Sequence, residues 1–418
     1  MNLIQQYDYL FMTIFALQIL SSRSFSLGSH ATFMTVRSAP RSLRPSTITL
    51  FENQSSSETT SIETDINFDE FQEMNNDEMS MQISSPLKFI GPYPCLSLHF
   101  PKLATSSQRE RDVSGISLDF VLDTAANTNT INAQVASELN LDSVGSALPG
   151  YNAAGAMDGG STFLLGDCGL DLPELKREMF MSGLTASALP VASPAAAGLL
   201  GVAFLNCFQG GVKFEWSNQP KVTFYGDSNG MESELANMTR APIEIIKDVL
   251  LPSVALKVNG KEIRALLDTG SPITVLNSAA AELAGLDVIQ LPNQRDEEVQ
   301  GSKKSGGFFN PFQKVMDNVK EANLLAQAAA RGDVLTIAGA QGQAVQLLRT
   351  ESVAKLSVRG ETRDISFPEN KIYVGDLPGL AALGGLNGNS SPPAAVLGMD
   401  VLAKKSSMLY RMDEVYFS

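Results

Sequence analysis

Apolar and polar residues alternate with a period of two along most of the chain after residue 86, which is the pattern of half-buried strands. The runs are short and are separated by turn residues, chiefly glycine, proline, asparagine and aspartate. Helical spacing is brief, at residues 135–139, 280–283 and 312–319. The pattern therefore predicts an all-β protein of many short strands with few helices.

The strand pattern occurs twice, in residues 88–225 and again in residues 244–417. In each copy two apolar strands are followed by a strand that ends in an aspartate, then by a short helix, and later by an apolar-apolar-glycine step. A last pair of strands closes each copy. We therefore predict two similar β lobes, residues 86–231 and 232–418, each with a short helix. An insert at about 290–335 in the second lobe is predicted to contain a helix.

The first 85 residues lack this pattern. Residues 9–20 are apolar and have the length of a signal-peptide core, and the rest of a leader up to residue 50 is rich in serine and arginine and free of acids. This combination resembles the bipartite plastid leaders of algae with complex plastids; a secreted or endomembrane protein with a propeptide is the alternative. Residues 51–85 are acidic and polar, which predicts a disordered linker.

Composition restricts the chemistry to carboxylates. A net charge of -14 argues against a nucleic-acid partner, which requires a basic face. Three scattered cysteines form no pair with metal-ligand spacing, and a catalytic triad would depend on His99, because the other histidine, His30, lies in the leader. No metal and no organic cofactor is implied.

The two aspartates that end the duplicated strands are Asp123 and Asp268. Each is followed by threonine, as Asp123-Thr-Ala-Ala126 and Asp268-Thr-Gly-Ser271. A single aspartate of this kind is most simply a turn residue that caps its own backbone. Its recurrence at the same place in both copies favours a shared site instead.

Here the sequence resembles the retropepsin-like aspartic peptidases over about residues 86–418. Asp268-Thr-Gly-Ser271 matches their active-site motif, the glycine-rich segments near Gly155 and Gly339 are similar to their flaps, and Leu200-Gly201 and Leu397-Gly398 to their apolar-apolar-glycine step. Retropepsins build the site from two identical chains, whereas this chain carries both halves, as pepsins do. The resemblance thus implies a monomer with an intramolecular pseudo-dimer.

The resemblance implies an endopeptidase in which Asp123 and Asp268 share a proton and activate a water molecule. Thr124 and Thr269 would brace the two active-site loops, Gly270 would allow close backbone approach, and Ser271 would hydrogen-bond the catalytic carboxylate. The substrate would be a polypeptide, held extended beneath the flaps.

The first copy departs from the family pattern, because Ala125 replaces the motif glycine and Ala126 stands where Ser271 stands in the second. This leaves two other readings open: an inactive peptidase-like module that binds peptides or proteins, or a structural β protein with turn aspartates. Asp400, opposite Ala203 in the repeat, is interpreted as a residue that satisfies backbone groups at a turn rather than as a third catalytic acid.

Overall fold

The structure is a computed structural model. The residues it describes are 17–18, 82–111, 115–146, 150–152, 155–157, 160–175, 178–189, 196–228, 231–246, 250–290, 325–338, 344–381 and 392–418.

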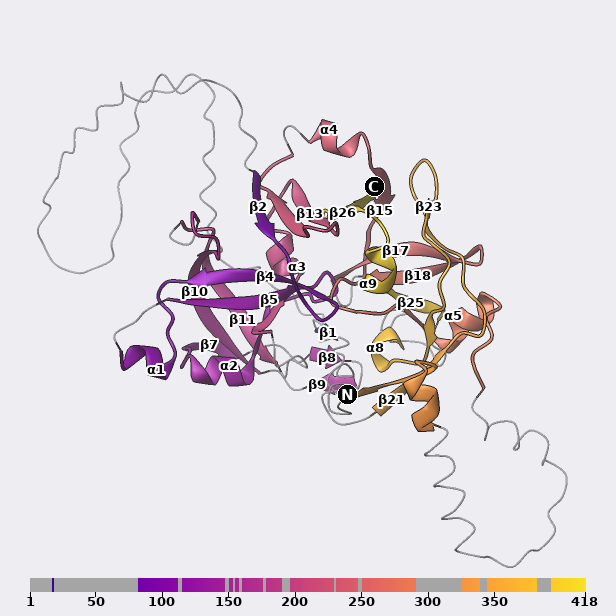
Figure 1. The fold of residues 1–418 in the computed structure, drawn as a ribbon, viewed down its shortest axis with the longest axis horizontal. Coiled ribbons are helices and arrows are strands. Elements are labelled where there is room, and N and C mark those ends of the chain that lie inside the picture. Colours follow the sequence, from indigo (N-terminus) through magenta and orange to yellow (C-terminus); the bar gives the residue numbers. More distant parts are fainter. Residues whose placement is uncertain are drawn as a thin grey trace, which may run out of the picture. The chain divides into compact units, whose positions relative to one another are not determined.

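The first lobe is built on an eight-stranded sheet (Figure 1). An additional pairing of β4 with β10 joins two strands that lie far apart in the order, so the sheet closes on itself. In spatial order its strands are β3 (Lys88–Ile90), β4 (Tyr93–Phe100), β5 (Ile116–Leu122), β12 (Gly198–Leu200), β6 (Thr130–Asn132), β11 (Met181–Leu189), β10 (Ser161–Leu170) and β7 (Ser143–Ser146).

The second lobe repeats this arrangement in a ten-stranded sheet. The long strand β10 has two shorter counterparts here, because β21 pairs with β24 while β22 pairs with β17. The strand order is β20 (Val334–Ala338), β21 (Ala344–Arg349), β24 (Tyr373–Val374), β19 (Val275–Leu276), β25 (Ala394–Leu397), β18 (Lys261–Leu267), β17 (Leu251–Val258), β22 (Leu356–Val358) and β23 (Ile365–Ser366), with β16 (Glu244–Ile246) beside β17.

A third sheet takes strands from both halves of the chain, and its order is symmetric. The closing strands of the two copies pair with each other at its centre, with Val212 opposite Tyr410 and Phe214 opposite Met408. From one edge to the other the strands are β15 (Thr239–Pro242), β27 (Glu414–Phe417), β26 (Ser407–Tyr410), β13 (Gly211–Glu215), β14 (Lys221–Tyr225) and β2 (Gln82–Pro86). The two lobes therefore share backbone hydrogen bonds as well as side-chain contacts.

The all-β prediction, with a short helix in each lobe, is confirmed. The helices are α2 (Ala133–Glu138) and α5 (Ser278–Leu283), and each begins at an asparagine. The side chain of Asn132 accepts from the amide of Gln134, and that of Asn277 from the amide of Ala280, so both helices start where a capping side chain satisfies a free amide. The other short helices are α1 (Ser106–Arg109), α3 (Val202–Leu205), α4 (Glu232–Leu235), α8 (Pro378–Ala381) and α9 (Met399–Leu402).

One predicted boundary changes. The linker was predicted to run through residue 85, but β2 begins at Gln82 and pairs with β14, because Ile83 and Ser85 contribute buried surface to the shared sheet. Of the insert, residues 325–330 are helical, whereas the predicted helical positions at 312–319 lie outside the described residues. The leader also lies outside them except for β1 (Leu17–Gln18), which pairs with β8 (Gly150–Asn152).

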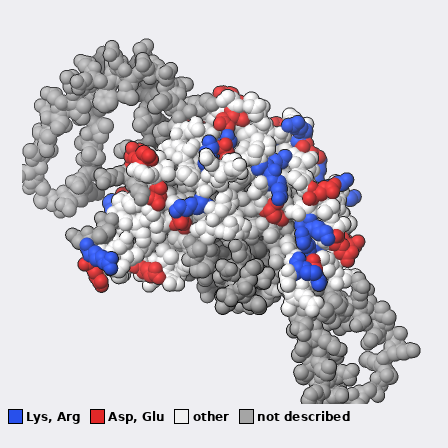
Figure 2. Space-filling model, in the orientation of Figure 1, with Lys and Arg blue, Asp and Glu red and all other residues white. Residues whose placement is uncertain are grey.

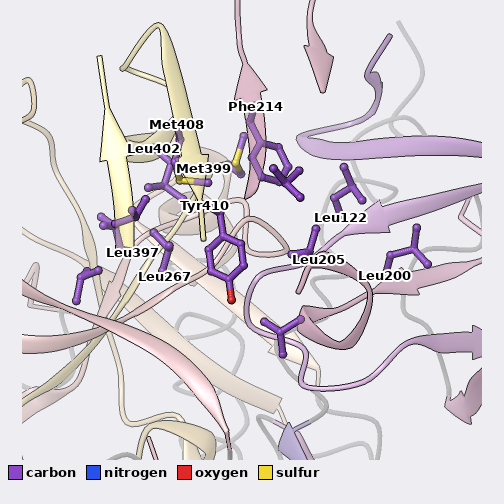
Figure 3. Packing of buried hydrophobic residues seen from close by; sticks show 14 of the residues in the cluster. Leu122, Leu200, Leu205, Phe214, Leu267, Leu397, Met399, Leu402, Met408 and Tyr410 are labelled. Atoms are coloured by element: carbon purple, nitrogen blue, oxygen red, sulfur yellow. The ribbon is translucent and has the colours of Figure 1, made fainter. Parts of the chain in front are cut away.

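The largest apolar cluster contains residues of both copies (Figure 3). Leu122 and Leu267, which precede the two aspartates, are both fully buried in it. Tyr410 belongs to the same cluster, and its hydroxyl donates at 3.2 Å to the side chain of Asn206, the residue that ends α3. The strands that end in the aspartates are thus anchored in one continuous core.

On the face shown in Figure 2, acidic and basic side chains are interspersed over the described surface. Ion pairs at the described surface include Lys257 with Asp364 and Arg359 with Glu262. Surface pairs of this kind contribute little to stability. Within the described part of the chain, no helix has the length and apolar character needed to cross a membrane.

Candidate active site

Asp123 and Asp268 lie at equivalent ends of equivalent strands. Strand β5 runs parallel to β12 and delivers Asp123, whose amide donates to the carbonyl of Leu200 at 3.0 Å. Strand β18 runs parallel to β25 and delivers Asp268, whose amide donates to the carbonyl of Leu397 at 3.1 Å. The strand pairing therefore fixes the backbone of each aspartate before any side-chain contact is considered.

The two threonines that follow the aspartates bond each other reciprocally. The amide of Thr124 donates to the hydroxyl of Thr269 at 3.1 Å, and the amide of Thr269 donates to the hydroxyl of Thr124 at 3.0 Å. Each hydroxyl also donates to the backbone of the opposite lobe, Thr124 to Leu267 at 2.6 Å and Thr269 to Leu122 at 2.7 Å. Both threonines are fully buried, so these four bonds lock the two loops together.

The lock brings the loop of the second lobe against the carboxyl group of the first. A Cβ atom built on Gly270 would lie 2.4 Å from Cγ of Asp123, so only glycine fits there. The two carboxyl groups also influence each other, because the charge of Asp123 raises the pKa of Asp268. Both residues are buried, with 7% of Asp123 and 1% of Asp268 exposed.

Burial raises the pKa of both acids above the ordinary value of 3.8. The pKa of Asp123 rises to about 6 through loss of hydration, although the amide of Ala125 and the nearby Asp268 carboxyl lower it. Loss of hydration and then the charge of Asp123 raise the pKa of Asp268 well above its ordinary value. Two adjacent buried carboxyls cannot both ionise cheaply, so the pair holds one proton over a wide pH range.

The two carboxyl groups differ in their hydrogen bonds. Asp123 accepts from the amide of Ala125 at 2.8 Å. Hydrogen bonds from the amides of Gly270 and Ser271 lower the pKa of Asp268, and its hydrogen bond with the Asp123 carboxyl raises it. The two carboxyl groups hydrogen-bond each other, so the shared proton belongs to the pair.

Ala125 occupies its place without backbone strain. It is absent from the described non-glycine residues with positive φ, and it is 1% exposed. Its methyl group packs in an apolar cluster with residues of the second lobe, including Ile246 and Leu380. The departure from the motif glycine is therefore accommodated by the fold.

Ser271 does not play the predicted part. Its hydroxyl donates to the carbonyl of Ile273 at 2.8 Å, so it stabilises its own loop rather than the catalytic carboxylate. The serine and its counterpart Ala126 consequently differ less in function than the sequence suggested, since both supply a backbone amide near their own aspartate.

Sequence reasoning missed Asn129 and Thr274, which lie six residues after their respective aspartates. The side chain of Asn129 accepts from the amide of Gly201, and the hydroxyl of Thr274 accepts from the amide of Gly398, each at 3.1 Å. The signal that would have found them is their equal spacing in the two copies. Both hold the apolar-apolar-glycine step against the loop that carries the aspartate.

Of the two predicted flap residues, the structure describes Gly155, which lies in a hairpin. Gly155 begins β9 (Gly155–Met157), which pairs antiparallel with β8 so that Gly155 faces Asn152. Strands β20 and β21 form the matching hairpin of the second lobe, in which Ala338 faces Ala344. Gly339 follows β20 directly and lies outside the described residues.

Comparison with known proteins links the second lobe to a family. The profile of the aspartyl protease family matches residues 254–306, which include Asp268 and its motif. Among curated proteins, none matches this chain.

Solved structures that match this chain have low sequence identity and low TM-scores. An aspartic proteinase from Irpex lacteus has 10% identity, covers 81% of this chain and 97% of its own, and has a TM-score of 0.37. Basic 7S globulin from soybean has 12% identity, covers 78% and 94%, and has a TM-score of 0.36. At these values the similarity carries no argument about the site.

Proposed function

We propose that the chain is an aspartic-protease-like endopeptidase in which Asp123 and Asp268 activate one water molecule between them. The observation that carries the proposal is the reciprocal threonine lock, which joins the two aspartate loops over a sequence separation of 145 residues. A pair of turn aspartates has no need of such a connection. Two carboxyl groups that share one proton, as Asp123 and Asp268 do in this proposal, can act as a general acid and a general base.

In the proposed reaction the ionised carboxylate of Asp123 takes a proton from water as the water oxygen attacks the scissile carbonyl carbon. The neutral Asp268 gives its proton to the carbonyl oxygen, which produces a tetrahedral diol. Collapse of the diol returns one hydroxyl proton to Asp268, breaks the C–N bond, and transfers the proton held by Asp123 to the leaving amine. The pair thus ends with the protonation state in which it began.

The substrate is proposed to be a polypeptide in extended conformation. In this proposal the backbone of the substrate pairs, as an added strand, with the hairpins β8–β9 and β20–β21. Apolar side chains of the second-lobe cluster that contains Ala125, among them Leu251 and Ile337, favour an uncharged environment beside the acids. Such surroundings strengthen the electrostatic part of catalysis.

Cleavage of a peptide mixture, followed by mass spectrometry, tests the proposal. Wild type, D123N and D268N are compared with D413N, which changes an exposed acid in a turn of the closing hairpin. We expect D413N to cleave like wild type and both site variants to lose activity by about 100-fold or more. In water enriched in oxygen-18, each new carboxyl terminus should gain one heavy oxygen. Equal cleavage by D268N and wild type would rule the proposal out.

A second candidate is a module that binds peptides without cutting them. Ala125 favours it, because this methyl group stands where the motif has glycine and increases the burial of the site. Under this alternative, wild type binds a statine-containing peptide, an analogue of the tetrahedral diol, but releases no product at any pH between about 4 and 8.

A further inference from the structure

In both lobes the glycine of the apolar-apolar-glycine step lies directly against the loop that follows the aspartate. A Cβ atom on Gly201 would lie 2.3 Å from the carbonyl oxygen of Ala126, and one on Gly398 would lie 2.3 Å from that of Ile273. Backbone therefore packs on backbone at these two points. The position of each aspartate depends on how firmly this contact is held.

The two lobes hold the contact with different chemistry. In the first lobe the amide oxygen of Asn129 accepts directly from the amide of Gly201. In the second lobe the acceptor is the hydroxyl of Thr274, which donates its own proton to Oδ1 of Asp400 at 2.7 Å. The residue of the first lobe that corresponds to Asp400 is Ala203, an exposed residue.

This difference has a physical reason. An amide oxygen such as that of Asn129 can only accept, so its role is fixed once the side chain is placed. A hydroxyl rotates and can donate or accept. The hydroxyl oxygen of Thr274 therefore accepts reliably from the amide of Gly398 only when the hydroxyl proton is donated to another acceptor. Asp400 is the acceptor of this proton. The bond is well protected, since Thr274 is fully buried.

We propose that Asp400 is a positioning residue for Asp268, which acts through Thr274 and Gly398 to hold the active-site loop of the second lobe. The inference rests on the proposed peptidase function where it concerns catalysis. The positioning role of Asp400 also applies if the site binds peptides without cutting them, because the same loop carries Asp268 in either case.

The surroundings of Asp400 agree with this role. Burial raises its pKa to about 6, while the hydroxyl and amide of Thr274 lower it. Two titratable side chains face the carboxyl: the charge of Lys404 stabilises the ionised form of Asp400, and Asp400 in turn raises the pKa of Tyr373. Its partner is Thr274 rather than either catalytic aspartate, which distinguishes it from a third catalytic acid.

Steady-state kinetics test the catalytic part. D400A removes the acceptor, and we expect kcat to fall by about 10-fold or more with KM nearly unchanged, since a small displacement of a reacting group is costly. D400N retains an acceptor oxygen and should recover most of the loss, and D413N should match wild type. Equal activity of D400A and wild type, or an equal loss in D400N, would overturn the proposal.

Amide hydrogen exchange gives a readout independent of turnover. In the D123N/D268N background, D400A and T274V should speed exchange at Gly398 by about 10-fold or more, while Gly201, held by Asn129, should stay as protected as before. Unchanged exchange at Gly398 would refute the proposed role of Asp400, whether or not the protein cleaves peptides. If wild type cleaves no peptide but the variants show the expected exchange at Gly398 and Gly201, the result would count against the peptidase function alone.

Discussion

Thr124 and Thr269 exchange amide-to-hydroxyl hydrogen bonds at 3.1 and 3.0 Å across the two halves of the chain. Each hydroxyl then donates to the carbonyl of the leucine that precedes the opposite aspartate. One short motif thereby performs two tasks, since it joins the lobes and sets the distance between the acids.

The first prediction concerns this lock. T269V keeps the shape of the side chain but leaves the amide of Thr124 and the carbonyl of Leu122 without partners, which should cost about 2–3 kcal/mol of unfolding free energy. Chemical denaturation measures the change. T269S keeps the hydroxyl and serves as the matched control, so a loss of the same size in T269S would show that the methyl group, and not the hydrogen bonds, matters.

The sequence predicted the acids and the lock but not the sheet that joins the lobes. Asp123 and Asp268 could be found because local strand patterns and the duplication carry the signal. The pairing of Val212 with Tyr410 could not, because alternating patterns reveal that a strand has a buried face but not which strand lies beside it.

The same limit applied within the site. Asp400 was interpreted as a turn residue, and its bond to Thr274 was not predicted because it joins residues 126 positions apart. Ser271 was assigned to the catalytic carboxylate by resemblance, whereas its hydroxyl bonds Ile273. A motif identifies which residues gather at a site, but side-chain partners depend on rotamers that sequence alone leaves open.

The second prediction concerns pH and activity. The pair works when one carboxyl is ionised and the other is neutral, so cleavage should fall as pH drops through the pKa of about 6 of Asp123. The pKa of Asp268 is also raised well above its ordinary value, and ionisation of this second acid should produce the falling limb at higher pH. A pH profile of kcat/KM measures both limbs, and an optimum near pH 3 would contradict this assignment of the two acids.

The third prediction concerns pH and stability. The unfolded chain releases the proton of Asp123 near 3.8, whereas the folded protein holds it to about 6, so the unfolding free energy should decrease as pH rises through this interval. The contribution of this one group is at most about 3 kcal/mol. D123N should therefore be less sensitive to pH than wild type in urea denaturation between pH 3.5 and 7. An identical slope in both proteins would show that Asp123 is ionised as easily in the folded state as in water.

The last prediction uses the inequality of the two loops. The Gly270 position has no room for a methyl group, because a Cβ atom there would lie 2.4 Å from Cγ of Asp123. G270A should therefore displace the carboxyl and reduce kcat/KM by about 100-fold. The reciprocal change A125G removes a methyl group from the second-lobe cluster, which lets water approach Asp268 and should lower its pKa.

A125G should consequently retain activity while the falling limb of its pH profile moves to lower pH, at a stability cost of about 1 kcal/mol for the added backbone freedom. The two variants exchange the same pair of residue types at equivalent positions, so each controls for the other. If A125G lost as much activity as G270A, the alanine would be part of the catalytic geometry. If G270A were harmless, the close approach of the second loop to Asp123 would be wrong.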